Sequence, residues 1–256
     1  MKIVQIPLDQ AVSDGPIDAF SHMVLSPFPR MQEILGCLDE QRAAFPSDRF
    51  LCTLDDLNQC CYTSMHASSD DERIALDADV GEDMSSPAEA LAARCTVLMH
   101  VIERLESSEH RVEWSALTGS LRCSDQDIWA LSEVNDDPDS ILDEVVCIQR
   151  VPVMREDLLI AALPNGYFEA DWNIFQNHAL TRHLRDRYSY RLFGIGASWL
   201  GFQRDDLLAS DDILELISDL QAVYGSQGST EAWSALSDVL RLRTTLLLGY
   251  TEDFRV

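Results

Sequence analysis

The spacing of apolar residues predicts a long helix in the N-terminal half of the chain. Apolar side chains recur every three or four residues from Leu91 to Leu105, as on one face of a helix. Ser86, Pro87 and Glu89 precede them and supply an N-cap, a proline at the first helical position and an acid at the third. The stripe lasts only about two heptads, which is short for a coiled coil. We therefore expect it to pack against the core.

Helical spacing predicts further helices near both ends of the chain. Ile17, Phe20 and Val24 follow this spacing close to the N-terminus. Residues 210–224 and 229–248 follow it near the C-terminus, and a turn that contains two glycines separates them. Helices therefore dominate the predicted secondary structure.

Strand patterns are fewer. Residues 145–153 form a nearly continuous apolar run, which is typical of a buried strand. Residues 188–203 combine aromatic and β-branched side chains with three glycines, a pattern that predicts two strands joined by a tight turn. The sequence thus predicts an α+β fold that is mainly helical, with a small mixed or antiparallel sheet.

The acidic residues are concentrated in the first part of the chain. The 256 residues include 44 acids and 19 bases, which gives a formal net charge of −25. Residues 1–149 hold 29 acids against 9 bases, whereas the remainder of the chain holds 15 against 10. The polar run at 135–139 interrupts the apolar pattern and predicts a boundary. We expect an acidic helical part over 1–134 and an α+β part over 135–256, or one continuous domain that contains both.

This charge limits the classes of partner. An acidic surface repels the phosphates of nucleic acids and anionic membranes, and it speeds the encounter with a basic protein. No apolar run approaches the roughly 18 residues that a membrane helix needs, and Asp9 precedes any signal-peptide core. The seven cysteines show no repeated short spacing, which favours reduced thiols over disulfides. We expect a cytoplasmic protein that binds neither nucleic acid nor membrane.

Two short motifs resemble ligand-binding loops but lack a required residue. Gly194 and Gly196 begin a pattern like that of a nucleotide-binding loop, yet Trp199 stands where the third glycine is needed. Residues 77–81 begin like a calcium loop, yet Ala88 stands where the closing acidic ligand is needed. The sequence therefore predicts no metal site and no cofactor.

Potential acid and base groups are densest between residues 166 and 187. The candidate catalytic residues there are Glu169, Asp171, His178 and His183. The two histidines are five residues apart, which places them about 140° apart around a helix, so only the tertiary fold could bring them to the acids. A hydrolase or transferase that uses this cluster for general acid–base catalysis is one alternative function.

The leading functional hypothesis from the sequence is a binding protein without catalysis. Its acidic surface would neutralise a basic toxin or enzyme, as a bacterial immunity protein does. Ten acids in two loops would form the docking face. They are Asp70, Asp71, Glu72, Asp77, Asp79, Glu82, Asp83, Asp136, Asp137 and Asp139. A further alternative is a structural or regulatory module that self-associates through the helix from Leu91 to Leu105.

Overall fold

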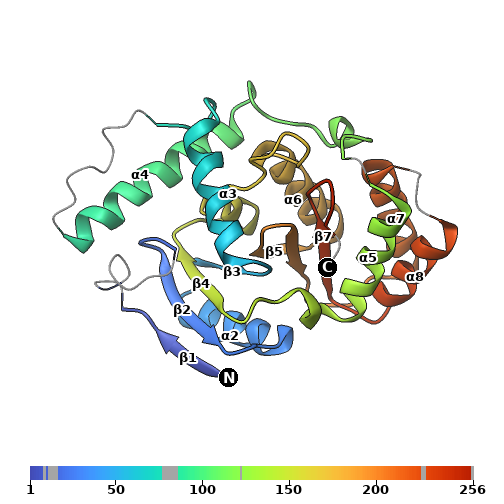
Figure 1. The fold of residues 1–256 in the computed structure, drawn as a ribbon, viewed down its shortest axis with the longest axis horizontal. Helices are drawn as coiled ribbons and strands as arrows, with labels where there is room; N and C mark the ends of the chain where they lie inside the picture. Colours follow the sequence, from blue (N-terminus) through green and yellow to red (C-terminus); the bar gives the residue numbers. More distant parts are fainter. Residues whose placement is uncertain (8–9, 11–16, 77–85, 122, 226–228, 255–256) are drawn as a thin grey trace.

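A seven-stranded mixed sheet forms the centre of the molecule (Figure 1). The computed structural model describes residues 1–7, 10, 17–76, 86–121, 123–225 and 229–254. The strands are β1 (Lys2–Gln5), β2 (Ser21–Ser26), β3 (Arg49–Thr53), β4 (Val146–Val151), β5 (Arg191–Ile195), β6 (Trp199–Gln203) and β7 (Thr245–Gly249). Their spatial order is β1-β2-β4-β3-β5-β6-β7. Neighbouring strands are antiparallel except β3 and β5, which are parallel.

Helices pack on and around this sheet. The α-helices are α2 (Met31–Ala44), α3 (Leu57–Asp70), α4 (Pro87–Glu106), α5 (Asp125–Asp136), α6 (Ile174–Tyr188), α7 (Ser210–Tyr224) and α8 (Thr230–Leu240). Shorter 3₁₀ helices are η1 (Trp114–Leu117), η2 (Pro138–Ile141) and η3 (Glu156–Ala161). Figure 1 shows α5, α7 and α8 gathered beside β7, whereas α4 extends on the opposite side of the molecule.

The sheet is larger than the sequence predicted, so the expectation of a mainly helical fold with a small sheet is wrong. The segment around Phe20 and Val24 shows why, because it contains strand β2 instead of a helix. Ser21, Met23 and Leu25 are buried while the residues between them are half-buried, which is the two-residue period of a strand. Over so short a segment, a few apolar residues can satisfy the helical and the strand pattern together.

The C-terminal end of the chain gives a second correction. The helix predicted over 229–248 ends at Leu240 as α8, and β7 begins at Thr245. Consecutive buried leucines, Leu246 to Leu248, occupy the middle of β7. A short apolar run of this kind fits a buried helix or a buried strand equally well. Pairing along β6 makes this run a strand.

The other predicted strands are confirmed. β4 lies within 145–153, and β5 and β6 form the antiparallel hairpin predicted over 188–203. The boundary expected between residues 134 and 135 stays a prediction. β4 follows that position in the chain, yet it lies in the sheet between β2 and β3, which precede it.

Helix α4 begins and packs as the sequence predicted. Ser86 Oγ accepts a hydrogen bond from the Glu89 amide, which caps the first turn. Leu98, Ile102 and Leu105 are buried, so the apolar stripe contributes to the core. Because these side chains are used within the chain, we do not propose self-association through this helix.

The sequence led us to expect no membrane-spanning helix and reduced cysteine thiols. Within the described ranges, no helix combines the length and apolar character needed to cross a membrane. All seven cysteines have free thiols.

Candidate functional site

A hollow of about 340 Å³ lies where α3 ends and α6 begins. The turn that follows α3, the loop at 165–171 and the first turn of α6 line it. Four carboxylates face this hollow, and we call it the acidic hollow after them. They are Asp70, Asp71, Glu169 and Asp171. From the sequence we expect the first two in a docking loop and the last two in an acid–base cluster, and the fold brings both pairs to one place.

Buried hydrogen bonds join the acidic hollow to the end of the central sheet. Asn165 is fully buried, accepts a hydrogen bond from Thr63 Oγ1 and donates one to the Gly196 carbonyl at the end of β5. Gly166 next to it has φ of +85°, and a Cβ there would lie 1.9 Å from the Trp172 carbonyl oxygen. Only glycine fits this turn. Asn165 and Gly166 therefore hold the start of the loop that carries Glu169 and Asp171 in one position.

The carboxyl ends of the parallel strands β3 and β5, where α/β sheets often bind ligands, are closed by packing. Asp55 follows β3 and accepts a hydrogen bond of 2.9 Å from the Ser198 amide. A Cβ added at Gly196 would lie 1.7 Å from Asp55 Oδ1, so the carboxyl fills this space. Burial raises the pKa of Asp55 to about 7. We assign it a structural role.

The carboxylates of the acidic hollow have different environments. Burial, together with the nearby charge of Glu252, raises the pKa of Asp171 to about 6. Burial also acts to raise the pKa of Asp71, but hydrogen bonds from Arg73 outweigh it and lower that pKa. Hydrogen bonds from Ser69 and His66 lower the pKa of the exposed Asp70. At neutral pH all three side chains favour the ionised form.

A series of aromatic rings lies beside the acidic hollow. Tyr62 and His66 on α3 have ring centroids 4.4 Å apart, and His66 lies 4.9 Å from Tyr167. Tyr167 and Phe168 follow at 5.3 Å in a T-shaped arrangement. Tyr62 is 47% exposed, Tyr167 38% and Phe168 47%. We call these four rings the aromatic row, and we call the row and the acidic hollow together the aromatic–acidic surface.

The sequence did not identify Tyr62 and His66 as site residues. They are four residues apart, so both lie on the same face of α3. That spacing indicates that the two rings are neighbours on the helix, but it does not indicate a site. Their contact with Tyr167, about a hundred positions later in the chain, is a tertiary feature that no local pattern could reveal.

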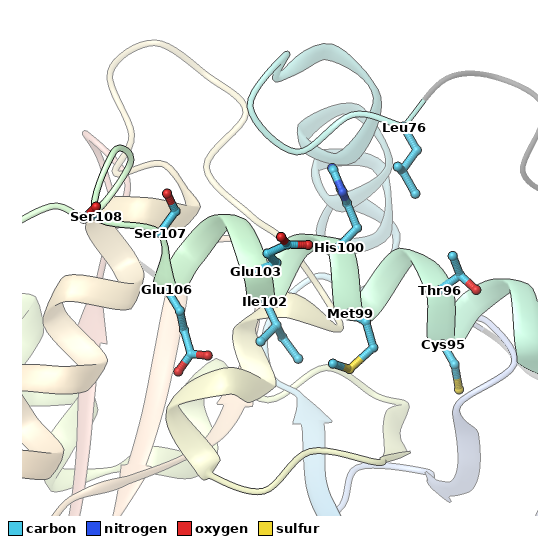
Figure 2. A pocket seen from close by; sticks show the side chains of 10 residues that line it. All are labelled: Leu76, Cys95, Thr96, Met99, His100, Ile102, Glu103, Glu106, Ser107 and Ser108. Atoms are coloured by element: carbon cyan, nitrogen blue, oxygen red, sulfur yellow. The ribbon is translucent and has the colours of Figure 1, made fainter.

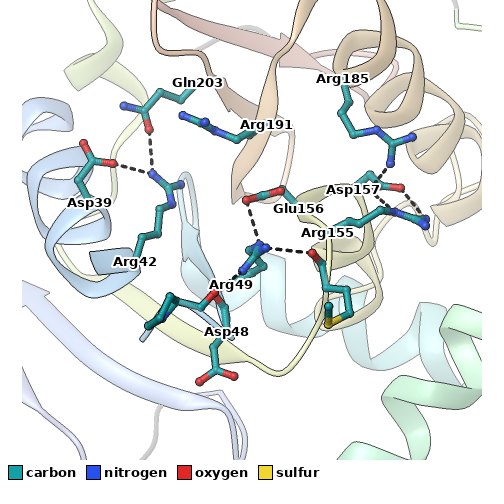
Figure 3. A network of polar contacts seen from close by, with 12 residues as sticks. Asp39, Arg42, Asp48, Arg49, Arg155, Glu156, Asp157, Arg185, Arg191 and Gln203 are labelled. Atoms are coloured by element: carbon teal, nitrogen blue, oxygen red, sulfur yellow. Dashed lines mark hydrogen bonds and ion pairs between the residues drawn. The ribbon is translucent and has the colours of Figure 1, made fainter. Parts of the chain in front are cut away.

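His178 does not face the acidic hollow. Its Nε2 lies 3.4 Å from Asp157 Oδ2, and both side chains are buried. Figure 3 shows Arg155 and Arg185 directed at the same carboxylate. Burial acts to raise the pKa of Asp157, but hydrogen bonds from His178 and the two arginines hold it far below its usual range. Burial lowers the pKa of His178. This network around the buried Asp157 joins η3 to α6 and serves the fold.

His183 lies in a third place. Its ring stacks on Trp114 with centroids 3.7 Å apart, and its Nε2 lies 2.7 Å from Asp219 Oδ2. Tyr188 donates a hydrogen bond to the same oxygen. The expected acid–base cluster is therefore divided: Glu169 and Asp171 share the acidic hollow, while each histidine binds a different aspartate elsewhere.

The acids of the first predicted docking loop fall partly outside the described residues. Asp70 and Asp71 line the acidic hollow, and Glu72 beside them is exposed. The remaining acids of that loop lie outside the described residues: Asp77, Asp79, Glu82 and Asp83.

The acids of the second predicted docking loop lie away from the acidic hollow. Figure 1 shows the end of α5 and η2 far from the end of α3. Asp137 borders a hollow that also contains Trp129, which is 37% exposed. Asp139 Oδ1 accepts a hydrogen bond of 2.7 Å from the Met31 amide at the start of α2, and Asp136 lies 3.9 Å from Arg243. We call this second region the α5 surface.

A larger hollow of about 1080 Å³ follows α4 (Figure 2). Figure 2 shows Cys95 and Met99 on one side of the helix and His100 on the other. The polar groups of this hollow do not converge on a common point, so we do not place the functional site there. Within the described part of the chain, no group of three or more potential ligands is arranged to hold a metal ion.

Comparisons with protein-family models, with curated proteins and with solved structures found no match to this chain, so its function is inferred from the geometry of the aromatic–acidic surface.

Proposed function

We propose that this protein is a binding protein that docks a basic protein partner on its aromatic–acidic surface. The observation that carries the proposal is the exposed aromatic row in direct contact with a carboxylate-lined hollow. An inhibitor that neutralises a basic enzyme or toxin would use such a surface.

The aromatic row supplies anchor side chains. Isolated exposed apolar residues are normal on protein surfaces, but contiguous ones mark interaction sites. Tyrosine is enriched among the residues that dominate binding energy, because it combines a large ring with a hydrogen-bonding group. Tyr62, Tyr167 and Phe168 are exposed and in a continuous series through His66. A partner that covered them would bury three large rings at once.

The carboxylates give the surface its preference for a basic partner. Four acids line the hollow, and Arg73 is the one base among its described lining residues. The chain as a whole has a formal charge of −25, so its long-range field also attracts cations. Complementary charge of this kind raises the association rate and excludes acidic partners.

A random peptide library displayed on phage tests this proposal, because it selects the preferred partner chemistry from all sequences. Peptides selected on the intact protein should combine arginine or lysine with an apolar residue. Their binding should be lost in the double variant Tyr62→Ala, Phe168→Ala. The matched control is the double variant Asp136→Asn, Asp137→Asn at the α5 surface, which should bind like the parent. Selected peptides that lack basic residues, or that bind the aromatic variant normally, would refute the proposal.

One observation favours a second candidate, a hydrolase or transferase. Asp171 has a pKa of about 6 in a hollow that it shares with Glu169, and a carboxyl with a raised pKa can act as a general acid. A screen with nitrophenyl esters, phosphates and glycosides tests it. Turnover that Asp171→Asn abolishes and Asp136→Asn preserves would support catalysis, whereas turnover by neither parent nor variant would count against it.

A further inference from the structure

The acidic hollow combines three features that suit a single cationic side chain. At about 340 Å³ it lies at the small end of ligand sites, which range over roughly 300–1,000 Å³. Tyr167 and Phe168 line it and are also exposed, so a ligand from solvent can reach both rings. A cation within about 6 Å of an aromatic face is attracted by the ring's quadrupole. The two rings are 5.3 Å apart and T-shaped, so they present faces in different directions.

The carboxylates of the hollow are not balanced by its own base. Arg73 Nε and Nη2 donate hydrogen bonds of 2.8 and 2.6 Å to the two oxygens of Asp71, which pairs these two side chains with each other. Asp70 Oδ2 lies 3.3 Å from His66 Nδ1, and among the described residues no arginine or lysine forms an ion pair with Asp70, Glu169 or Asp171. A cation that entered would meet net negative charge.

Two lining residues of the hollow, Arg73 and Asp71, already form one example of the interaction together with the buried Phe175 behind them. The Arg73 guanidinium lies over the Phe175 ring, with Cζ 4.1 Å from the centroid, while it binds the Asp71 carboxylate at two points. A planar guanidinium can satisfy a ring face and a carboxylate together in this way, whereas an ammonium group cannot bind a carboxylate by the same two-point fork. The vicinity of Tyr167, Phe168 and Glu169 offers the same pair of groups to a second guanidinium.

We infer that the acidic hollow receives the guanidinium group of one arginine side chain from the partner. This inference rests on the proposed docking function and names the partner group that enters the surface. Tyr167 and Phe168 contact the guanidinium through their rings, and Glu169 and Asp171 accept its hydrogen bonds.

Three small amides test the inference by titration against amide resonances of the full chain. N-acetylarginine methylamide is the probe, N-acetylcitrulline methylamide is its neutral counterpart of nearly equal shape, and N-acetyllysine methylamide tests the fork geometry. We expect the arginine amide to bind with a dissociation constant on the order of millimolar and to shift resonances of 165–171. We expect the citrulline amide to bind at least about tenfold more weakly, and the lysine amide to fall between them.

Two double variants distinguish binding in the hollow from attraction by the overall negative charge of the chain. The double variant Glu169→Gln, Asp171→Asn should weaken the arginine amide by about tenfold or more, since it removes both acceptors' charges. Asp136→Asn with Asp137→Asn removes the same charge elsewhere and should leave binding unchanged. The amide spectrum of each variant alone reports whether it folds. Equal shifts from the arginine and citrulline amides, or shifts that centre on another surface, would overturn the inference.

Failure of this inference and failure of the docking proposal give different results. If the arginine amide does not bind in the hollow but library peptides still require Tyr62 and Phe168, the docking surface stands and the arginine inference falls. If library peptides bind equally well without these rings, the docking proposal is wrong, whether or not the arginine amide binds in the hollow.

Discussion

The aromatic–acidic surface and the α5 surface carry similar acidic sequences but use their carboxylates differently. At the aromatic–acidic surface, Asp70 and Glu169 line a hollow beside four rings in contact. At the α5 surface, Asp139 holds the first amide of α2, and Trp129 is the one large exposed ring. Similar acidic runs therefore line the surface that we propose for docking in one region and stabilise the fold in the other.

This difference explains why we propose one acidic region and not the other as a binding site. Charge raises the rate of encounter, but anchor side chains determine how long a complex lasts. The α3 end has both, because α3 and the loop at 165–171 bring rings and acids together. The α5 surface has charge with a single ring. The comparison predicts that binding energy is concentrated at the first surface.

The largest expected effect comes from removing a ring. Tyr62→Ala and Phe168→Ala should each weaken a selected basic peptide by roughly 10- to 30-fold, as anchor residues do. Trp129→Ala at the α5 surface should change affinity by no more than about twofold, because Trp129 lies outside the proposed docking surface. Isothermal titration calorimetry measures all three. Equal losses from Tyr62→Ala and Trp129→Ala would remove the distinction between the surfaces.

A smaller effect is expected from removing charge beside the rings. The double variant Asp70→Asn, Glu169→Gln should lower the association rate by about 3- to 10-fold at low salt, and the difference should shrink at about 0.5 M salt because ions screen exposed charges. Stopped-flow mixing with a selected peptide measures the rate. The pair Asp136→Asn, Asp137→Asn should lower it less. The reverse order would show that charges at the α5 surface control the encounter.

The raised pKa of Asp171 makes the free energy of unfolding depend on pH. Its pKa in the folded chain, about 6, lies above the ordinary value of 3.8, so the folded state holds this proton more tightly than the unfolded state. The free energy of unfolding should therefore fall through this group as pH rises from about 4 to 6, by about 1 to 2 kcal/mol after allowance for solvent screening. Asp171→Asn should remove this part of the dependence. Urea unfolding of both proteins at several pH values measures it, and parallel curves would contradict it.

The smallest effect concerns the α5 surface itself. Asp139→Ala removes the acceptor of the Met31 amide at the start of α2, and loss of such a cap costs about 1 kcal/mol. Thermal unfolding should show this destabilisation, while affinity for a selected peptide stays unchanged. A loss of affinity without a loss of stability would instead assign Asp139 to the docking face.

Local sequence patterns predicted the elements whose periodicity or capping is distinctive. Ser86 and the stripe from Leu91 to Leu105 defined α4, and the glycine-rich segment at 188–203 defined the hairpin. The sequence predicted helix for strands β2 and β7, because their short apolar runs fit the helical and the strand period equally well. Pairing with β4 and β6 in the sheet makes these segments strands. The size of the sheet therefore could not be read from local pattern.

The candidate site was predictable only in part for a similar reason. Glu169 and Asp171 stood in a dense polar stretch, and the fold keeps them together. The angle between His178 and His183 around one helix already argued against a single cluster, and the structure places them with different aspartates. The contact between α3 and the loop at 165–171 depends on the packing of the whole chain, so the aromatic row could not be foreseen.

Amide chemical-shift changes on addition of one selected basic peptide show directly where a basic partner binds. We expect the largest changes at Tyr62, His66, Tyr167 and Phe168, with smaller changes at the acids of the hollow. Changes that centre on Trp129 and the end of α5, or that spread evenly over the acidic surface, would contradict it.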